Sequence, residues 1–204
     1  NLRSFVGCAI LTKCFVWTWL QMDSEKISAL IQQGISEGVF PGAVAIVVAG
    51  GRICYCKAFG YRMISPAVKV MQSDTLFDLA SLTKPIVVAT LIMRLVEEGS
   101  LELDAPVQTY LPEFSYEQVT LLHLLTHTSG LPAWRPIYLE AKSKAEVLDY
   151  LGGMPFEYPT GQRVVYSCLG YILLGLLIAQ VGGKSLDRLA RDRIFSPLEM
   201  SNTW

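Results

Sequence analysis

Apolar and polar residues follow two different periodicities along this 204-residue chain, which together predict an α+β fold. Residues 43–49 and 52–60 are rich in β-branched and aromatic side chains, and Gly50-Gly51 between them predicts the turn of a β-hairpin. Other stretches have helical spacing or long apolar runs, which predict helices at 24–37, 85–96, 121–125, 144–151, 171–181 and 186–194.

Several of these predicted helices have recognisable ends. Asp23 and Ser185 precede apolar runs and are expected to cap the first free backbone N–H groups. Ser143 is followed three residues later by Glu146, the spacing of a capping box. Gly38 is expected to end the first helix.

The composition is that of a globular protein and argues against several functions. Hydrophobic residues make up 51% of the chain and charged residues 17%, with a net charge of -1. Without a basic block or a phosphate-binding glycine motif, nucleic acid is not an expected partner. Five cysteines lack zinc-type spacing, and Cys54 and Cys56 are expected to pack in a core, with a metal or a disulfide as the alternative.

Residues 1–21 differ from the rest of the chain. Phe5 to Leu20 is almost wholly apolar apart from Lys13, yet it is short for a membrane span and lacks the ends of a signal peptide. We expect the domain to cover residues 22–204, with 1–21 as an apolar leader or an extraneous segment. A native start near Met22 predicts a cytoplasmic protein, whereas a leader predicts a membrane-associated or exported one.

The chain contains one Ser-x-x-Lys, Ser81-Leu82-Thr83-Lys84, just before the apolar run 85–96. At the start of a helix, Lys84 would lie on the same face as Ser81, and the helix dipole would favour negative charge there. A serine needs its proton removed before it can attack, and a buried lysine with a depressed pKa can assist. The alternative is that Ser81 only caps the helix and Lys84 is solvated.

A second motif, Tyr166-Ser167-Cys168, precedes the apolar run 171–181. Together with Ser81 and Lys84 it resembles the serine beta-lactamase and penicillin-binding-protein superfamily, in particular the class C beta-lactamase-related branch, which also holds esterases and D-amino-acid peptidases. Three further stretches carry this resemblance, which covers about residues 23–204: Phe40-Pro41-Gly42-Ala43, Leu124-Leu125-Thr126-His127-Thr128-Ser129-Gly130-Leu131 and Ile194-Phe195-Ser196-Pro197-Leu198-Glu199-Met200.

The resemblance implies a serine hydrolase that transfers acyl groups from a small-molecule or peptide substrate, with no metal and no cofactor. Ser81 would be the acylated nucleophile, Lys84 its neighbouring cation and Tyr166 the base, as a phenolate held by Lys84. Cys168 stands where class C enzymes usually have a substrate-binding Asn. A thiol cannot replace both halves of an amide, so an ester, a D-amino-acid peptide or a beta-lactam all stay open as the substrate.

The resemblance also implies a beta-lactamase/transpeptidase-like fold: a helical lobe plus an N-terminal helix and the β-hairpin of a larger antiparallel sheet. Further strands and a Lys/His-Thr/Ser-Gly motif would follow residue 204, so 22–204 is expected to be an incomplete domain. This chain by itself is then expected to be inactive and to self-associate through its exposed sheet edge. The alternative function is a non-catalytic relative or inactive fragment that acts as a binding module.

Other readings of single residues stay open. Tyr166 could be a core tyrosine, and Cys168 could itself be a nucleophile. His127 is expected to hold its own turn by bonding local backbone, with a Ser-His pair as the alternative. Asp78 is expected to cap the backbone ahead of Ser81.

Overall fold

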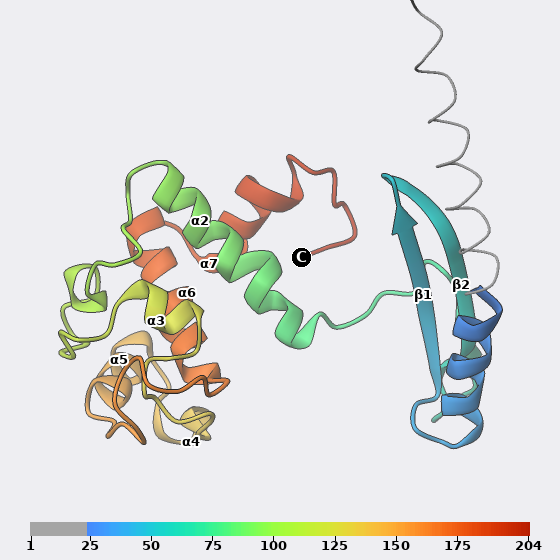
Figure 1. The fold of residues 1–204 in the computed structure, drawn as a ribbon, viewed down its shortest axis with the longest axis horizontal. Coiled ribbons are helices and arrows are strands. Elements are labelled where there is room, and N and C mark those ends of the chain that lie inside the picture. The colour runs from blue at the N-terminus through green and yellow to red at the C-terminus, as the bar shows by residue number, and fades with distance from the viewer. Residues whose placement is uncertain (1–23) are drawn as a thin grey trace, which may run out of the picture. The chain divides into compact units, whose positions relative to one another are not determined.

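The computed structural model describes residues 24–204, and the chain divides after Phe77 into two separately packed units (Figure 1). The described part of the first unit is 24–77, and the second is 78–204. The expected cap Asp23 and the expected boundary at residue 22 lie outside the described residues.

The first unit contains the predicted helix and hairpin. Residues 24–36 are helical, and strands β1 (Gly42–Ala49) and β2 (Arg52–Met63) pair antiparallel. The joining residues Gly50 and Gly51 have φ of 57° and 73°. Glycine adopts this left-handed conformation without steric cost, so the turn favours glycine at both positions. A short strand, β3 (Lys69–Val70), extends the order to β1-β2-β3; two residues carry too little alternation to be predicted.

One side of the hairpin is tied to the helix, because the Ser28 and Tyr55 hydroxyls are hydrogen-bonded at 2.7 Å. Ile46, Val48 and Ile53 are instead 55–67% exposed. The predicted core packing of Cys54 and Cys56 is wrong, since both thiols are free and exposed. Alternation on a strand predicts which side chains share a face, but it does not say whether that face is covered.

The second unit is helical. The helices predicted at 121–125, 144–151 and 171–181 are present with modest shifts of their ends. The helix predicted at 186–194 is α-helical over Leu186–Ala190 and π-helical over Arg191–Phe195, and a short helix at Ile137–Glu140 is not among those predicted. The segments are η1 (Ala80–Leu82), η2 (Lys84–Ala89), α2 (Thr90–Glu97), η3 (Val107–Thr109), α3 (Leu121–Leu125), α4 (Ile137–Glu140), α5 (Lys144–Gly152), α6 (Cys168–Gly182), α7 (Leu186–Ala190) and η4 (Arg191–Phe195).

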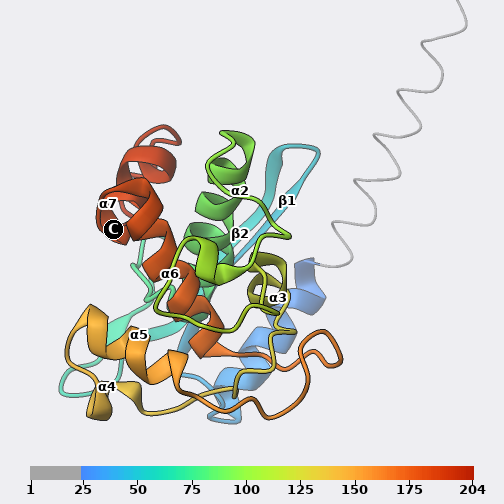
Figure 2. The ribbon, with the colours of Figure 1, turned by 90° about the vertical axis from the view of Figure 1, so that its left-hand side faces the viewer.

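Helix α6 is the centre of this unit, with η2, α2, α3, α5 and α7 packed around it (Figure 2). Four of its leucines, Leu169, Leu173, Leu174 and Leu177, are completely buried. A helix that is apolar on all sides is stable only when it is surrounded, which fits this position. Among the described residues no single helix could cross a membrane by length and composition, although α6 and Leu186–Phe195 pass that test as a pair bent by 74°.

The helix expected after Ser81 is not regular. It begins as a 3₁₀ turn (η1), widens into the π-helical η2 and becomes α-helical only from Thr90. Pro85 contributes no N–H to the first turn, and the Thr90 hydroxyl donates to the Pro85 carbonyl at 3.0 Å. Periodicity locates a helix but cannot reveal such a change of winding, which is frequent at functional sites.

The caps are only partly as expected. The Ser143 hydroxyl accepts the Glu146 N–H at 3.3 Å, as predicted, while the Glu146 carboxylate accepts the N–H of Lys142 at 2.7 Å. Ser185 stands at the start of α7 but makes no capping hydrogen bond through its side chain, so that prediction is wrong.

We propose that the hairpin associates with a second copy of this chain, because β1 has a strand on only one side among the described residues and Ile46 and Val48 lie exposed on it. Ile46→Lys should then shift the chain toward the monomer in size-exclusion chromatography with light scattering. Gln32→Lys adds the same charge at an exposed position of the helix at 24–36, so it is the control and should leave the oligomeric state unchanged. A wild-type chain that is monomeric at every concentration would contradict the proposal.

Candidate active site

Ser81 lies on a strained turn. Ala80, immediately before it, has φ of 45°, a left-handed conformation that costs a non-glycine residue about 1–3 kcal/mol and is typical of functional sites. The Asp78 carboxylate accepts the Ala80 N–H at 2.9 Å and so holds this conformation, consistent with the expected capping role. The turn leaves Ser81 exposed to solvent.

Lys84 follows on the same side of the turn. Its Nζ donates to Ser81 Oγ at 3.3 Å. The same Nζ lies 5.0 Å from the centre of the Tyr166 ring and 5.9 Å from that of Tyr171. The two sequence motifs, Ser-x-x-Lys and Tyr-Ser-Cys, therefore meet at one place within the second unit.

The charges of this cluster differ from the expectation for Lys84. Burial, the largest single influence, lowers the pKa of Lys84, but hydrogen bonding to Tyr166 and Cys168 and the negative charge that these groups can carry outweigh it, so the pKa is raised. The prediction that the pKa of Lys84 is depressed is therefore wrong. The spacing in the sequence places Ser81 near Lys84, but it does not reveal that Tyr166 also lies beside this lysine. An amine that stays protonated cannot accept a proton.

Tyr166 is the group suited to act as the base. Hydrogen bonding to Lys84 first, and then to Ser81, lowers the pKa of its phenol. Its side chain is 50% exposed, so the reading as a core tyrosine is wrong. A phenol that ionises more readily and contacts the serine can take up that proton.

Ser167, the middle residue of the second motif, has a structural role. Its side chain is almost completely buried, and its hydroxyl donates to the Pro132 carbonyl at 2.7 Å and accepts the Gly170 N–H at 3.3 Å, which caps α6. This anchoring fixes the backbone between Tyr166 and Cys168, the two residues whose side chains interact with Lys84.

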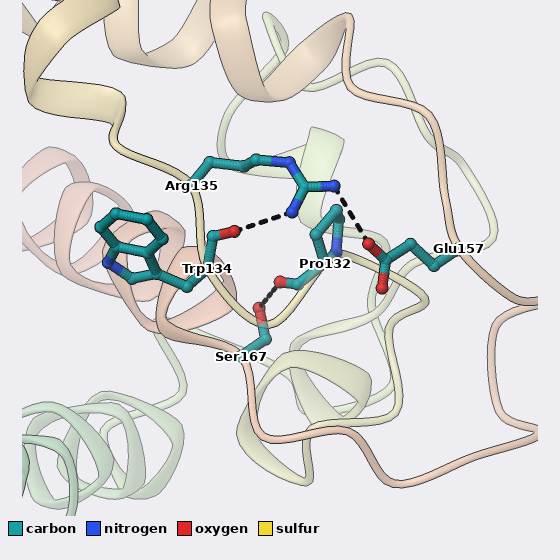
Figure 3. A network of polar contacts seen from close by, with 5 residues as sticks. All are labelled: Pro132, Trp134, Arg135, Glu157 and Ser167. Carbon is teal, nitrogen blue, oxygen red and sulfur yellow. Dashed lines mark hydrogen bonds and ion pairs between the residues drawn. The ribbon is translucent and has the colours of Figure 1, made fainter.

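Nearby polar contacts hold the same loops together (Figure 3). Arg135 donates to the Glu157 carboxylate at 3.0 Å and to the Trp134 carbonyl at 2.9 Å, next to the contact between Ser167 and Pro132. The Cys168 N–H donates to the Ala133 carbonyl at 2.8 Å. The 132–135 loop therefore holds Ser167 and Cys168 of the second motif in place.

His127 is placed differently from the expectation. Its Nδ1 accepts the N–H of Ser167 at 3.1 Å, rather than bonding its own turn, and its ring centre lies 4.7 Å from that of Tyr166. Burial first, and the Lys84 charge second, lower its pKa and favour the neutral ring. The geometry connects His127 with the tyrosine motif and lends no support to a Ser-His pair.

His123 and Cys168 complete the account of the candidate residues. His123 belongs to a capping box, in which its Nδ1 accepts the Thr120 N–H at 3.2 Å. The half-buried Cys168 thiol lies close enough to Lys84 to hydrogen-bond with it. Within 24–204, no group of three or more His, Cys, Asp and Glu side chains is arranged to hold a metal ion.

Comparison with known proteins places this geometry in context. The family profile described as Beta-lactamase matches residues 27–204. The chain is 33% identical over 202 residues to an N-acetylmuramyl-L-alanine amidase of Bacillus subtilis, covering 88% of this chain and 45% of the relative. It is 37% identical over 199 residues to esterase EstB of Burkholderia gladioli, covering 87% and 50%.

Solved structures agree with the sequence matches. A class C beta-lactamase in complex with cefoxitin superposes with a TM-score of 0.79 at 28% identity, covering 90% of this chain and 51% of that one. An octameric penicillin-binding protein homologue from Pyrococcus abyssi gives 0.74 at 30% identity, covering 87% and 43%. The chain thus spans about half the length of the relatives it matches.

Ser167→Ala should destabilise the second unit by about 1–3 kcal/mol, because it removes a helix cap and leaves the buried Pro132 carbonyl without its partner. Chemical denaturation measures the loss. Ser143→Ala, which removes an exposed cap from helix α5, is the matched control and should cost about 0.5–1 kcal/mol. Equal losses in the two variants would show that the contact with Pro132 contributes nothing.

Lys84→Met should raise the pKa of Tyr166 toward its ordinary value, because the variant removes the first cause of its lowering. The phenol would then ionise at higher pH than in the wild type. Ultraviolet difference titration, with Tyr166→Phe to identify the signal, measures this shift. Lys142→Met removes the same charge from an exposed position and should leave the titration unchanged; an unshifted Tyr166 in Lys84→Met would contradict the coupling.

Proposed function

Because this chain belongs to the Beta-lactamase family, we propose that it is a serine hydrolase that transfers an acyl group through an ester on Ser81. The observation that carries the proposal is the contact of Ser81 Oγ with Lys84 Nζ at 3.3 Å, beside a tyrosine whose pKa is lowered by both residues. The relatives named above, an amidase, an esterase and a beta-lactamase, agree with this class of reaction.

The proposed reaction begins with proton transfer from Ser81 Oγ to the Tyr166 phenolate. Oγ then attacks the substrate carbonyl carbon and forms a tetrahedral intermediate. As the bond to the leaving group breaks, Tyr166 returns the proton to that group, and the acyl group stays on Ser81. Water releases the acyl group in a second round with the same proton transfers, so the tyrosine ends as it began.

Lys84 supports both rounds without exchanging its own proton. Its ammonium stabilises the phenolate before the reaction and Ser81 during it, because it contacts both. Burial opposes this charge, but Tyr166 and Cys168 outweigh burial and raise the pKa of Lys84, so the amine stays protonated. The proposed steps require no metal and no cofactor.

Turnover by residues 1–204 alone is proposed to be slow. The backbone N–H of Ser81 can stabilise the developing oxyanion, but the resemblance assigns a second donor to a further strand of the sheet. The Lys/His-Thr/Ser-Gly strand motif that the resemblance also implies does not occur in these 204 residues. Loss of one donor costs about 10²–10³ in rate. Formation of the acyl ester is therefore a better test than steady-state hydrolysis.

Cys168 bears on the substrate. It stands beside Lys84, where the resemblance places an amide that contacts substrate. A thiol is a weak donor and a weak acceptor, so it orients an amide-bearing substrate poorly. We propose that esters, which need no amide partner, are better acyl donors here than beta-lactams or D-amino-acid peptides.

The test is acylation by an activated ester, with intact mass and peptide mapping to locate the acyl group. Wild-type chain should gain one acyl group on Ser81, and Ser81→Ala should gain none while keeping its melting behaviour. Lys84→Ala and Tyr166→Phe should each slow acylation by about 10²-fold or more, because acid-base assistance is lost.

Ser100→Ala, an exposed serine of the same unit, is the matched control and should acylate at the wild-type rate. Labelling of Ser81→Ala at the wild-type level would show that Ser81 is not the nucleophile. A folded wild-type chain that gains no label would favour the alternative, a non-catalytic binding module.

A further inference from the structure

His127 holds the backbone on both sides of Tyr166. Its carbonyl accepts the N–H of Val165 at 2.9 Å, and its Nδ1 accepts the N–H of Ser167 at 3.1 Å. One residue thus holds the backbone N–H groups of the residues immediately before and after the tyrosine. The His127 ring also lies against Tyr166, with 4.7 Å between ring centres, and on Tyr171 at 5.0 Å.

The backbone of His127 has an uncommon conformation. With φ of 59° it is left-handed, a region that few residues other than glycine and asparagine adopt readily. Such strain persists only where the surroundings impose it, and it is frequent at functional sites. The carbonyl and the side chain of this strained residue reach the same short segment, 165–167.

The contact with Ser167 requires a neutral ring. Nδ1 can accept an N–H only through a lone pair, and a protonated imidazole has a donor at both nitrogens. The titratable groups that face the ring are Lys84 from η2, Tyr166 before α6 and Tyr171 within it. Burial and the Lys84 charge both oppose protonation, so the contact is intact near neutral pH.

We propose that His127 is a positioning residue that holds Tyr166 beside Lys84 and Ser81, and that protonation of His127 releases the tyrosine. The expected effect of His127 on the rate of acylation rests on the proposed function, whereas its expected effect on the pKa of Tyr166 does not. As the pH falls, ionisation of Tyr166 alone makes the acylation rate drop with a slope of one on a logarithmic plot. Once His127 protonates, the slope should increase toward two.

Two variants separate the hydrogen bond from the backbone conformation. His127→Asn places an amide oxygen where Nδ1 stands, and His127→Gly leaves no acceptor. Both residues tolerate the left-handed conformation, and both lack the aromatic ring. The pair therefore differs in the acceptor, and thermal melting of each variant shows that it is folded.

The first measurement is the pKa of Tyr166 in the full chain. It is obtained by NMR titration of tyrosine labelled at Cζ, and the Tyr166 signal is assigned by its loss in Tyr166→Phe. The pKa should rise toward the ordinary value in His127→Gly and stay near the wild-type value in His127→Asn. Equal Tyr166 values in the wild type and His127→Gly would overturn the proposal. Because this readout does not depend on activity, it decides the role of His127 even if Ser81 is never acylated.

The second measurement is the rate of Ser81 acylation as a function of pH. His127→Gly should be slower by roughly 10–100-fold, the effect of a misplaced catalytic group, and His127→Asn by no more than about threefold. The wild type should show the steeper acidic limb, and His127→Asn a slope of one throughout. Equal rates in the two variants, or a wild-type pH profile parallel to that of His127→Asn, would also overturn the proposal.

Discussion

The rest of the site depends on the interactions of the Lys84 ammonium with Ser81 and Tyr166. This ammonium contacts Ser81 in its own turn and Tyr166 from the start of α6, so a single positive charge connects two distant parts of the sequence. The pKa of Lys84 is raised in spite of burial, because Tyr166 and Cys168 are hydrogen-bonded to it and can carry negative charge. In the proposed reaction the serine gives its proton to the Tyr166 phenolate, and the Lys84 ammonium favours that phenolate because it lowers the pKa of the phenol.

That arrangement needs a rigid support, and apolar packing supplies it. The turn with Ser81 leads into η2, which packs on α6, and the buried Ser167 hydroxyl anchors the start of α6 to the 132–135 loop. Two residues, Ala80 and His127, are held in left-handed conformations next to Ser81 and Tyr166, respectively. Backbone strain at such positions is compatible with stability only because the core of the unit is closely packed around α6.

The fold limits the chemistry more than it limits the substrate. Relatives with comparable similarity carry the names of an amidase, an esterase and a beta-lactamase, so the shared architecture serves several acyl donors. Cys168 lies beside Lys84, and its thiol offers weaker hydrogen bonds than the amide that the family resemblance implies at this position. Since the chain spans about half the length of these relatives, residues that complete a substrate site can lie outside it.

Local sequence determined the hairpin around Gly50-Gly51, most helices of the second unit, the family and the four candidate residues, because glycine conformation, apolar spacing and short motifs act over a few residues. Only the tertiary structure decided the raised pKa of Lys84, the exposure of Cys54 and Cys56 and the partner of His127. These properties depend on which distant groups come into contact. Electrostatic and hydrogen-bonding environments are made by neighbours in space, which spacing along the chain does not reveal.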